Sequence, residues 1–162
     1  MHTTRLVAAF ALTAVVGAIV GAGALLAAAP TAKDDAVVYI DGGRTRAAFA
    51  KGQPLVETAA YKVHASRREA PGVAEIHTLD TDIIYILEGG ATIVTGGKAV
   101  NTKEVAPNEI RGSAIDGGAV QRLSKGDLFI VPNGVPHWFT EVQGPFLYYV
   151  VKATAAQTGG VK

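Results

Sequence analysis

Residues 74–82, with the sequence AEIHTLDTD, hold one histidine and three carboxylates. On an extended strand Glu75 and His77 point to the same face, because side chains alternate between the two faces. Val73 and Leu79 share that face, so a carboxylate and an imidazole stand among apolar neighbours. Burying such groups costs several kcal/mol unless they are paired or bound to a cation. The stretch therefore indicates either part of a metal site or a buried hydrogen-bonded pair.

Residues 126–141, GDLFIVPNGVPHWFTE, form the second stretch with chemical potential. An apolar strand ends at Pro132, and Gly134 and Pro136 turn the chain before His137 begins another strand. Proline lacks an N–H and suits a strand entrance. Asp80 and Asp82, in the turn after His77, are of a type common in turns for local hydrogen bonding alone, yet one of them can fold back over the same end of the barrel. His137 and one of these aspartates are thus candidates to join Glu75 and His77.

The elements that would position these side chains are short β-strands separated by glycine and proline. Only a short helix is expected, at residues 45–50. Residues 98–119 show little alternation and are expected to form a long ordered loop or an extra hairpin. Many short strands at about ten-residue spacing predict an all-β antiparallel sandwich or barrel. The expected strands cover residues 37–40, 60–65, 73–78, 83–88, 91–95, 120–123, 127–131, 137–142 and 146–152.

The first 32 residues read as a leader. Arg5 precedes an apolar run with no further charged residue before Lys33, which predicts a signal peptide and an exported, periplasmic or secreted protein. The alternative is a membrane anchor at residues 6–29, since the run exceeds the ~20 residues that span a bilayer. The predicted domain is residues 33–152, followed by a disordered tail at 153–162.

Composition excludes several classes of function. The chain has no cysteine, which rules out disulfides and thiolate metal sites. It has 15 basic and 14 acidic residues, and only Arg5 among them lies in the leader. A domain without net charge gives no reason to expect nucleic-acid binding, which needs a clustered basic surface.

The two stretches together resemble the cupin superfamily of small β-barrels. The second cupin motif, Gly-x5-Pro-x-Gly-x2-His-x3-Asn, is matched at Gly126, Pro132, Gly134 and His137, with Glu141 in place of Asn. The first, His-x-His-x3-4-Glu-x6-Gly, is matched at His77, Asp82 and Gly89, with Glu75 in place of the first His. The resemblance covers about residues 55–152. It implies a single-domain antiparallel double-stranded β-helix, or jelly-roll barrel.

In cupins the matching motif positions bind a divalent metal inside the barrel. The resemblance implies Glu75, His77, Asp82 and His137 as the ligands here. Two imidazoles and two carboxylates favour Fe(II) or Mn(II), and Zn(II) or Ni(II) also suit imidazole. Two alternatives stay open. In one, Glu75 and His77 are a structural pair; in the other, Glu75 and His137 transfer protons in a metal-free active site.

The resemblance implies three classes of function. An exported metal-dependent enzyme would act on a small organic molecule as a dioxygenase, lyase or isomerase. A non-catalytic module would bind a small acid or sugar with or without metal, and a structural protein would fill the barrel with side chains. Cupin resemblance also implies a homodimer formed through residues 37–40. Residues that could line a pocket are Tyr61, Tyr85, Arg111, Trp138 and Tyr148. Arg67 and Arg68 are expected mainly on a solvated turn, although either could pair with an anionic substrate.

Overall fold

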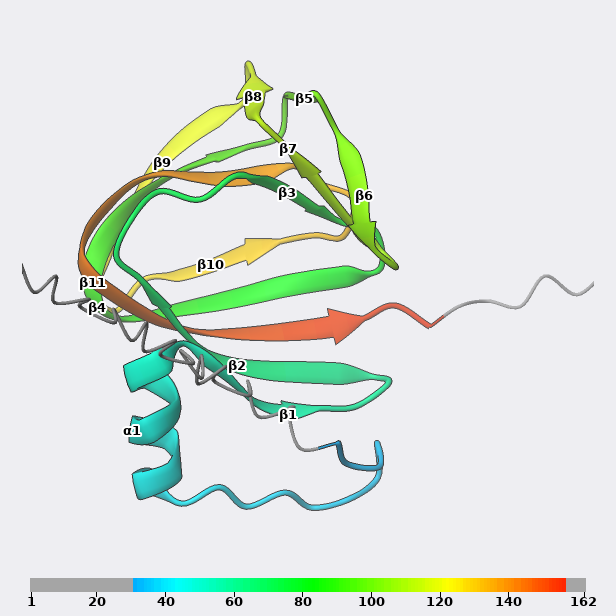
Figure 1. Ribbon diagram of the computed structural model, residues 1–162, viewed down its shortest axis with the longest axis vertical. Helices are drawn as coiled ribbons and strands as arrows, with labels where there is room; N and C mark the ends of the chain where they lie inside the picture. The colour runs from blue at the N-terminus through cyan, green and yellow to red at the C-terminus, as the bar shows by residue number, and fades with distance from the viewer. Residues whose placement is uncertain (1–30, 157–162) are drawn as a thin grey trace, which may run out of the picture.

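The computed structural model describes residues 31–156, which form a curled antiparallel sheet (Figure 1). The predicted leader, apart from Thr31 and Ala32, and residues 157–162 of the predicted tail lie outside the described residues. Among those described, no helix is long and apolar enough to cross a membrane. The described elements are α1 (Gly42–Lys51), β1 (Gln53–Glu57), β2 (Tyr61–Arg68), β3 (Ala74–His77), β4 (Asp80–Thr95), β5 (Lys98–Val100), β6 (Lys103–Ala106), β7 (Glu109–Gly112), β8 (Ala114–Asp116), β9 (Ala119–Ser124), β10 (Leu128–Val131) and β11 (His137–Thr154).

The main sheet runs in the order β1-β2-β11-β3-β7-β6, and β4 pairs with β9, β10 and β11. Strands β5 and β8 form a small separate hairpin-like sheet. Every strand pair is antiparallel, as predicted, apart from an isolated parallel bridge between Thr31 and Glu57. The sheet closes on itself around an apolar core that includes Ile84, Ile93 and Phe146. The all-β jelly-roll barrel predicted from the sequence is confirmed.

The long strands β4 and β11 bend to build the barrel wall. Each was expected as two strands broken at glycine, but the β4–β11 pairing resumes on both sides of Gly89 and of the bulges after Phe139 and Gln143. Glycine and bulges let a strand curve without ending it. Gly89 has φ +75°, and a Cβ there would lie 2.5 Å from the Pro145 carbonyl oxygen. Close backbone approach at this bend therefore requires glycine.

Helix α1 covers one end of the sheet beneath β1 and β2 (Figure 1). It is longer than the predicted 45–50. Asp41 caps it by accepting a hydrogen bond from the Arg44 backbone N–H, and Gly52 ends it at φ +63°. Ala48 packs with Leu55 and Ala65 in a second, small core.

Three expectations about the strands need correction. Residues 37–40 form no strand, because they pair with no strand among the described residues 31–156 and an unpaired run this short is not stable alone; Val37 and Tyr39 are exposed. Strand β1 was not predicted, because Pro54 argues against a strand. Proline is tolerated in edge strands, and β1 lies at the edge of the main sheet. Strand β11 runs to Thr154, two residues beyond the predicted end of the domain. Residues 98–119 form the short strands β5 to β8, in line with the expected extra hairpin.

Candidate functional site

Strand register brings Glu75, His77 and His137 together. Glu75 on β3 lies directly opposite His137 at the start of β11, and His77 follows Glu75 by two residues on the same face. The turn before β11 is tied to the end of β3, because the Gly134 N–H donates to the His77 carbonyl oxygen at 2.8 Å. The two sequence motifs are therefore joined by a backbone hydrogen bond as well as by facing side chains.

The distances suit a shared cation. A Glu75 carboxylate oxygen lies 4.0 Å from Nε2 of His77 and 4.0 Å from Nε2 of His137, and the three ligand atoms all lie within 4.8 Å of one another. Metal–ligand bonds to imidazole and carboxylate are about 2.0 to 2.2 Å, so a single ion between these atoms can bind all three after small inward movements of the side chains. The donor set is two histidines and one carboxylate, which fits a divalent transition metal.

Both imidazoles present a free nitrogen to this point. Nδ1 of His137 lies 3.2 Å from the Val135 carbonyl oxygen, and a proton donated there leaves the lone pair of Nε2 for a ligand. Burial lowers the pKa of His77, and the charge of the Lys152 ammonium lowers it further, against a smaller opposing effect of Asp82. His77 is thus held in the neutral form that a metal requires.

Asp82 reaches the site but is engaged by Lys152. Its carboxylate lies 3.5 Å from Nε2 of His77 and 3.7 Å from Nε2 of His137. Lys152 lies opposite Asp82 in the β4–β11 register and donates to both carboxylate oxygens, at 2.8 and 3.0 Å. Asp82 therefore lies where a fourth ligand would lie, but its carboxylate is already paired with Lys152. Its role as a metal ligand stays a prediction.

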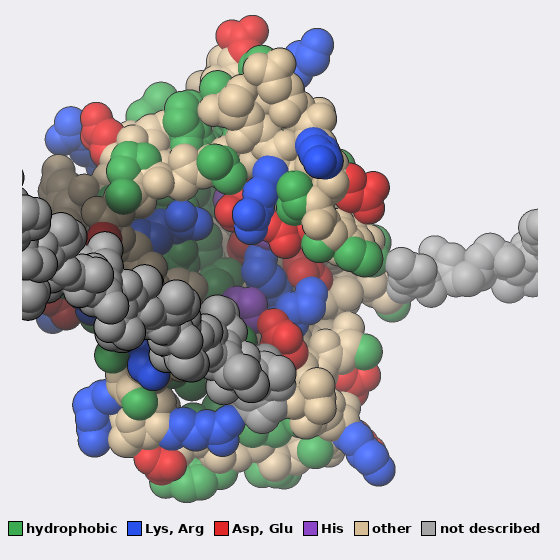
Figure 2. All heavy atoms as spheres, viewed as in Figure 1, with side chains coloured by type: hydrophobic (Ala, Val, Ile, Leu, Met, Phe, Trp, Pro, Cys, Tyr) green, Lys and Arg blue, Asp and Glu red, His purple; other side chains and the backbone are tan. Residues whose placement is uncertain are grey.

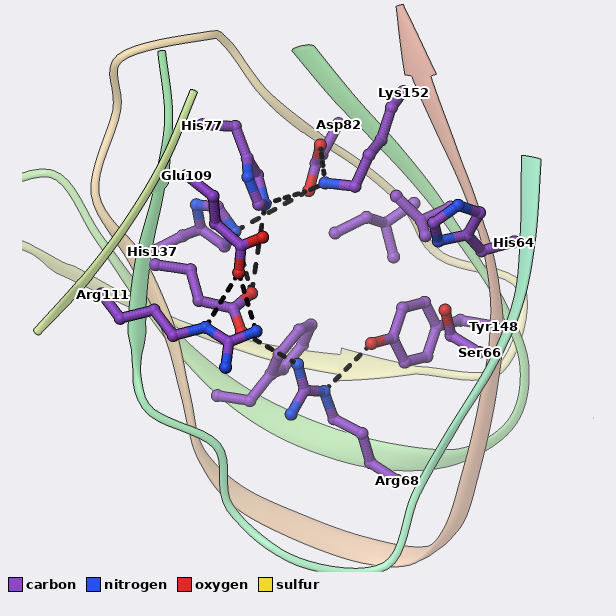
Figure 3. Close-up of a pocket in the computed structure, with 14 residues that line it drawn as sticks. His64, Ser66, Arg68, His77, Asp82, Glu109, Arg111, His137, Tyr148 and Lys152 are labelled. Carbon is purple, nitrogen blue, oxygen red and sulfur yellow. Dashed lines mark hydrogen bonds and ion pairs between the residues drawn. The ribbon is translucent and has the colours of Figure 1, made fainter. Parts of the chain in front are cut away.

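The cluster opens into a cavity of about 250 Å³ in the barrel (Figure 3). Alternation along each strand explains its lining: residues 64, 66 and 68 of β2 face it, as do 148, 150 and 152 of β11 and 109 and 111 of β7. Figure 2 shows the hollow in this face, with a histidine and side chains of both charges inside it. Arg68 and Arg111 also border a wider outer groove, so the cavity has an entrance between them.

Of the predicted pocket residues, Arg111 and Tyr148 line the cavity and the other three do not. Tyr85 lies between inward-facing Ile84 and Ile86, so it points outward and is 46% exposed. Trp138 alternates in the same way with His137, and its indole N–H donates to the Gly72 carbonyl oxygen. Tyr61 has the opposite parity to the inward-facing residues of β2. The expectation was wrong for Tyr61, Tyr85 and Trp138.

Sequence reasoning gave Lys152 and Glu109 no role, and it placed Arg68 on a turn. Arg68 is the last residue of β2 and reaches into the cavity. The strand alternation in HASRR and FLYYVVK could have revealed Arg68 and Lys152, because every second residue from His64 and from Tyr148 onward faces inward. Glu109 was hidden because β7 lacks an apolar alternation. His64 also lines the cavity, but its Nε2 lies 2.8 Å from a carboxylate oxygen of Glu57.

A sequence profile of the family described as Cupin matches residues 30–160. The chain belongs to the cupin family. No curated protein sequence matches this cupin. Similar solved structures include a Bacillus halodurans protein at 13% identity and a TM-score of 0.54, covering 76% of this chain and 86% of that one.

Two further structures show the same fold at comparable distance. A Neisseria meningitidis protein has 13% identity and a TM-score of 0.50, covering 72% of this chain and 100% of that one. A hydroquinone 1,2-dioxygenase solved with Cd²⁺ and 4-hydroxybenzonitrile has 12% identity and a TM-score of 0.50, covering 75% and 82%. At such identities the likeness shows the jelly-roll fold and leaves function to the site.

Proposed function

We propose that this cupin binds one divalent metal ion through His77, His137 and Glu75 and acts on a small organic molecule in the barrel cavity. The observation that carries the proposal is the convergence of two imidazole nitrogens and a carboxylate oxygen within 4.8 Å of one another. Fe(II) or Mn(II) suits the mixed nitrogen and oxygen donors best, and Zn(II) or Ni(II) is compatible with them. The apolar run after Arg5 supports export of the protein.

The bound metal would supply Lewis acidity or a site for O₂, which fits dioxygenase, lyase or isomerase chemistry. The chain's own groups have separate tasks. His77 and His137 hold the ion. Burial lowers the pKa of His77 and favours its neutral form, and the Val135 carbonyl orients the ring of His137. Glu75 supplies negative charge to the ion, and its second oxygen can accept a proton from a molecule bound beside it.

The Lys152–Asp82 pair favours a second candidate, a non-catalytic binding module without obligatory metal. This ammonium balances the buried Asp82 carboxylate without any ion, so the cavity is electrostatically self-consistent when metal-free. The two candidates differ in metal content and in the effect of histidine substitution.

The test is elemental analysis of protein purified without chelator or affinity metal and then dialysed against Mn(II). Wild type is expected to hold about one ion per chain, and His77→Ala and His137→Ala are expected to lose it. His64→Ala is the matched control, because His64 lines the same cavity and pairs with Glu57. Wild-type protein without metal, or equal retention in the His77 and His137 variants, would favour the binding module.

A further inference from the structure

Arg68 is held in a fixed position at the mouth of the cavity. Its Nε donates to the Tyr148 hydroxyl at 3.0 Å, and its guanidinium carbon lies 4.9 Å from the centroid of the Phe139 ring. Gly72 approaches the guanidinium so closely that a Cβ there would lie 2.6 Å from Nη1 of Arg68. A guanidinium confined by a ring, a hydroxyl and a backbone loses little entropy when it binds a ligand.

Arg68 differs from the other cations of the cavity in its pairing. Among the described residues that line it, Lys152 is bound to Asp82 at 2.8 Å and Arg111 to Glu109 at 2.7 Å. The carboxylate paired with Arg68 is Glu75, at 4.0 Å from Nη2, which is beyond hydrogen-bond distance. Glu75 is also the oxygen ligand of the proposed metal. Nη2 of Arg68, on the side of Glu75, thus has capacity for another anion in the cavity.

The charge of the filled site points the same way. The cavity wall carries three cations, Arg68, Arg111 and Lys152, against three carboxylates, Glu75, Asp82 and Glu109. A divalent ion added to this balanced set leaves an excess of positive charge in a partly buried space. Uncompensated buried charge is costly, so an anionic ligand is favoured over a neutral one such as a sugar.

We propose that the substrate of this site is a small hydroxy or oxo acid, whose carboxylate binds Arg68 and the Tyr148 hydroxyl while its second oxygen reaches the metal (Figure 3). This inference rests on the proposed metal site. Tyr148 accepts a hydrogen bond from Arg68 and keeps its own proton for the ligand. Burial raises the pKa of Tyr148, which keeps the hydroxyl protonated.

The dimensions restrict the acid to a compact one. The cavity of about 250 Å³ lies below the roughly 300 to 1,000 Å³ of pockets for drug-sized ligands. Nη2 of Arg68 is 4.0 Å from Oε1 of Glu75, the carboxylate whose other oxygen, Oε2, faces the two imidazoles, while N–H···O bonds to a charged group take about 2.8 Å and metal–oxygen bonds about 2.1 Å. The carboxylate and the second oxygen therefore belong on adjacent or nearly adjacent carbons.

The test measures binding of glycolate, lactate and pyruvate to Mn(II)-loaded protein by isothermal titration calorimetry, with lactamide as the uncharged probe. Metal content is measured first on every sample. Arg68→Gln is expected to weaken binding of the acids at least about tenfold, because charge-assisted hydrogen bonds are lost, while metal content stays unchanged. Arg67→Gln is the matched control, since Arg67 is adjacent in sequence and paired with Glu69.

Gly72→Ala tests the same inference without removing the charge. The added Cβ would displace the end of the Arg68 side chain and weaken the binding of the three acids, while metal content again stays unchanged. Failure of all three acids to bind below about 10 mM, binding of lactamide as tight as that of lactate, or an unchanged Arg68→Gln variant would overturn the inference while metal binding stands. Wild-type protein that binds no metal would instead refute the proposed function, and with it the inference that an acid substrate binds the metal.

Discussion

Replacing Lys152 with methionine should destabilise the metal-free protein strongly. The Lys152 and Asp82 side chains are 13% and 6% exposed, and the ammonium lies 2.8 and 3.0 Å from the two carboxylate oxygens. Removing one partner of a buried ion pair costs about 3 to 5 kcal/mol because the other charge is left unpaired. Asp82 keeps two imidazoles at 3.5 and 3.7 Å, so the loss is expected at the lower end, about 3 kcal/mol.

The measurement is chemical unfolding at pH 7.5, with and without saturating Mn(II). The ion should restore most of the lost stability in Lys152→Met, because the freed Asp82 then has a cation to bind and ligand binding stabilises the folded state. Lys62→Met is the matched control: Lys62 is 32% exposed, and its partner Asp80 also accepts from Thr154 at 2.7 Å. Equal losses in the two variants, or less than about 1 kcal/mol for Lys152→Met, would refute the reasoning.

The double variant Lys152→Met/Asp82→Asn separates the charge from the packing. If the cost of the single variant is the unpaired carboxylate, neutralising Asp82 should recover a large part of it. A double variant that is as unstable as the sum of the two single variants would show that Lys152 stabilises the barrel through its alkyl chain instead.

Three further outcomes are expected. Burial and the nearby Lys152 ammonium hold the pKa of His77 in the folded state below its ordinary value. The unfolded chain therefore binds more protons, and the metal-free protein loses stability as pH falls below about 6.5. His77→Gln should flatten this pH dependence in unfolding measurements between pH 7.5 and 5, and an unchanged slope would contradict the expectation. Gly89→Ala should cost at least about 3 kcal/mol through backbone overlap, against about 1 to 2 kcal/mol for Gly96→Ala, where φ is +73° and the space is open; similar melting temperatures for the two would contradict the close approach. The homodimer proposed through the exposed segment 37–40 should become a monomer in light scattering when Val37 and Tyr39 are replaced with aspartate, and a mass that does not change would contradict that interface.

The barrel and the centre of the site could be predicted because both depend on local patterns. Turn glycines and prolines mark where strands end, and the spacing of Glu75 and His77 places them on one face whatever the partner strand is. His137 follows a proline-glycine turn that fixes the start of β11. These features need no knowledge of which strands pair.

The rest of the cavity depends on register, which the sequence does not state. Lys152 meets Asp82 because residues 82 and 152 face each other across β4 and β11, although 70 positions separate them. Arg111 and Glu109 lie opposite Glu75 and His77 through the β3–β7 pairing. The outward placement of Tyr85 and Trp138 likewise follows from parity along strands whose bulges shift the alternation. Residue type alone predicted a cavity lined mainly by aromatic side chains, whereas strand pairing lines it largely with ion pairs.

The most direct test of the metal centre is an anomalous diffraction experiment on crystals of the protein loaded with Mn(II). The account predicts one strong peak in the barrel, about 2.0 to 2.2 Å from Nε2 of His77, Nε2 of His137 and a carboxylate oxygen of Glu75. A barrel with no peak at these three side chains, or an ion bound elsewhere on the protein, would contradict it.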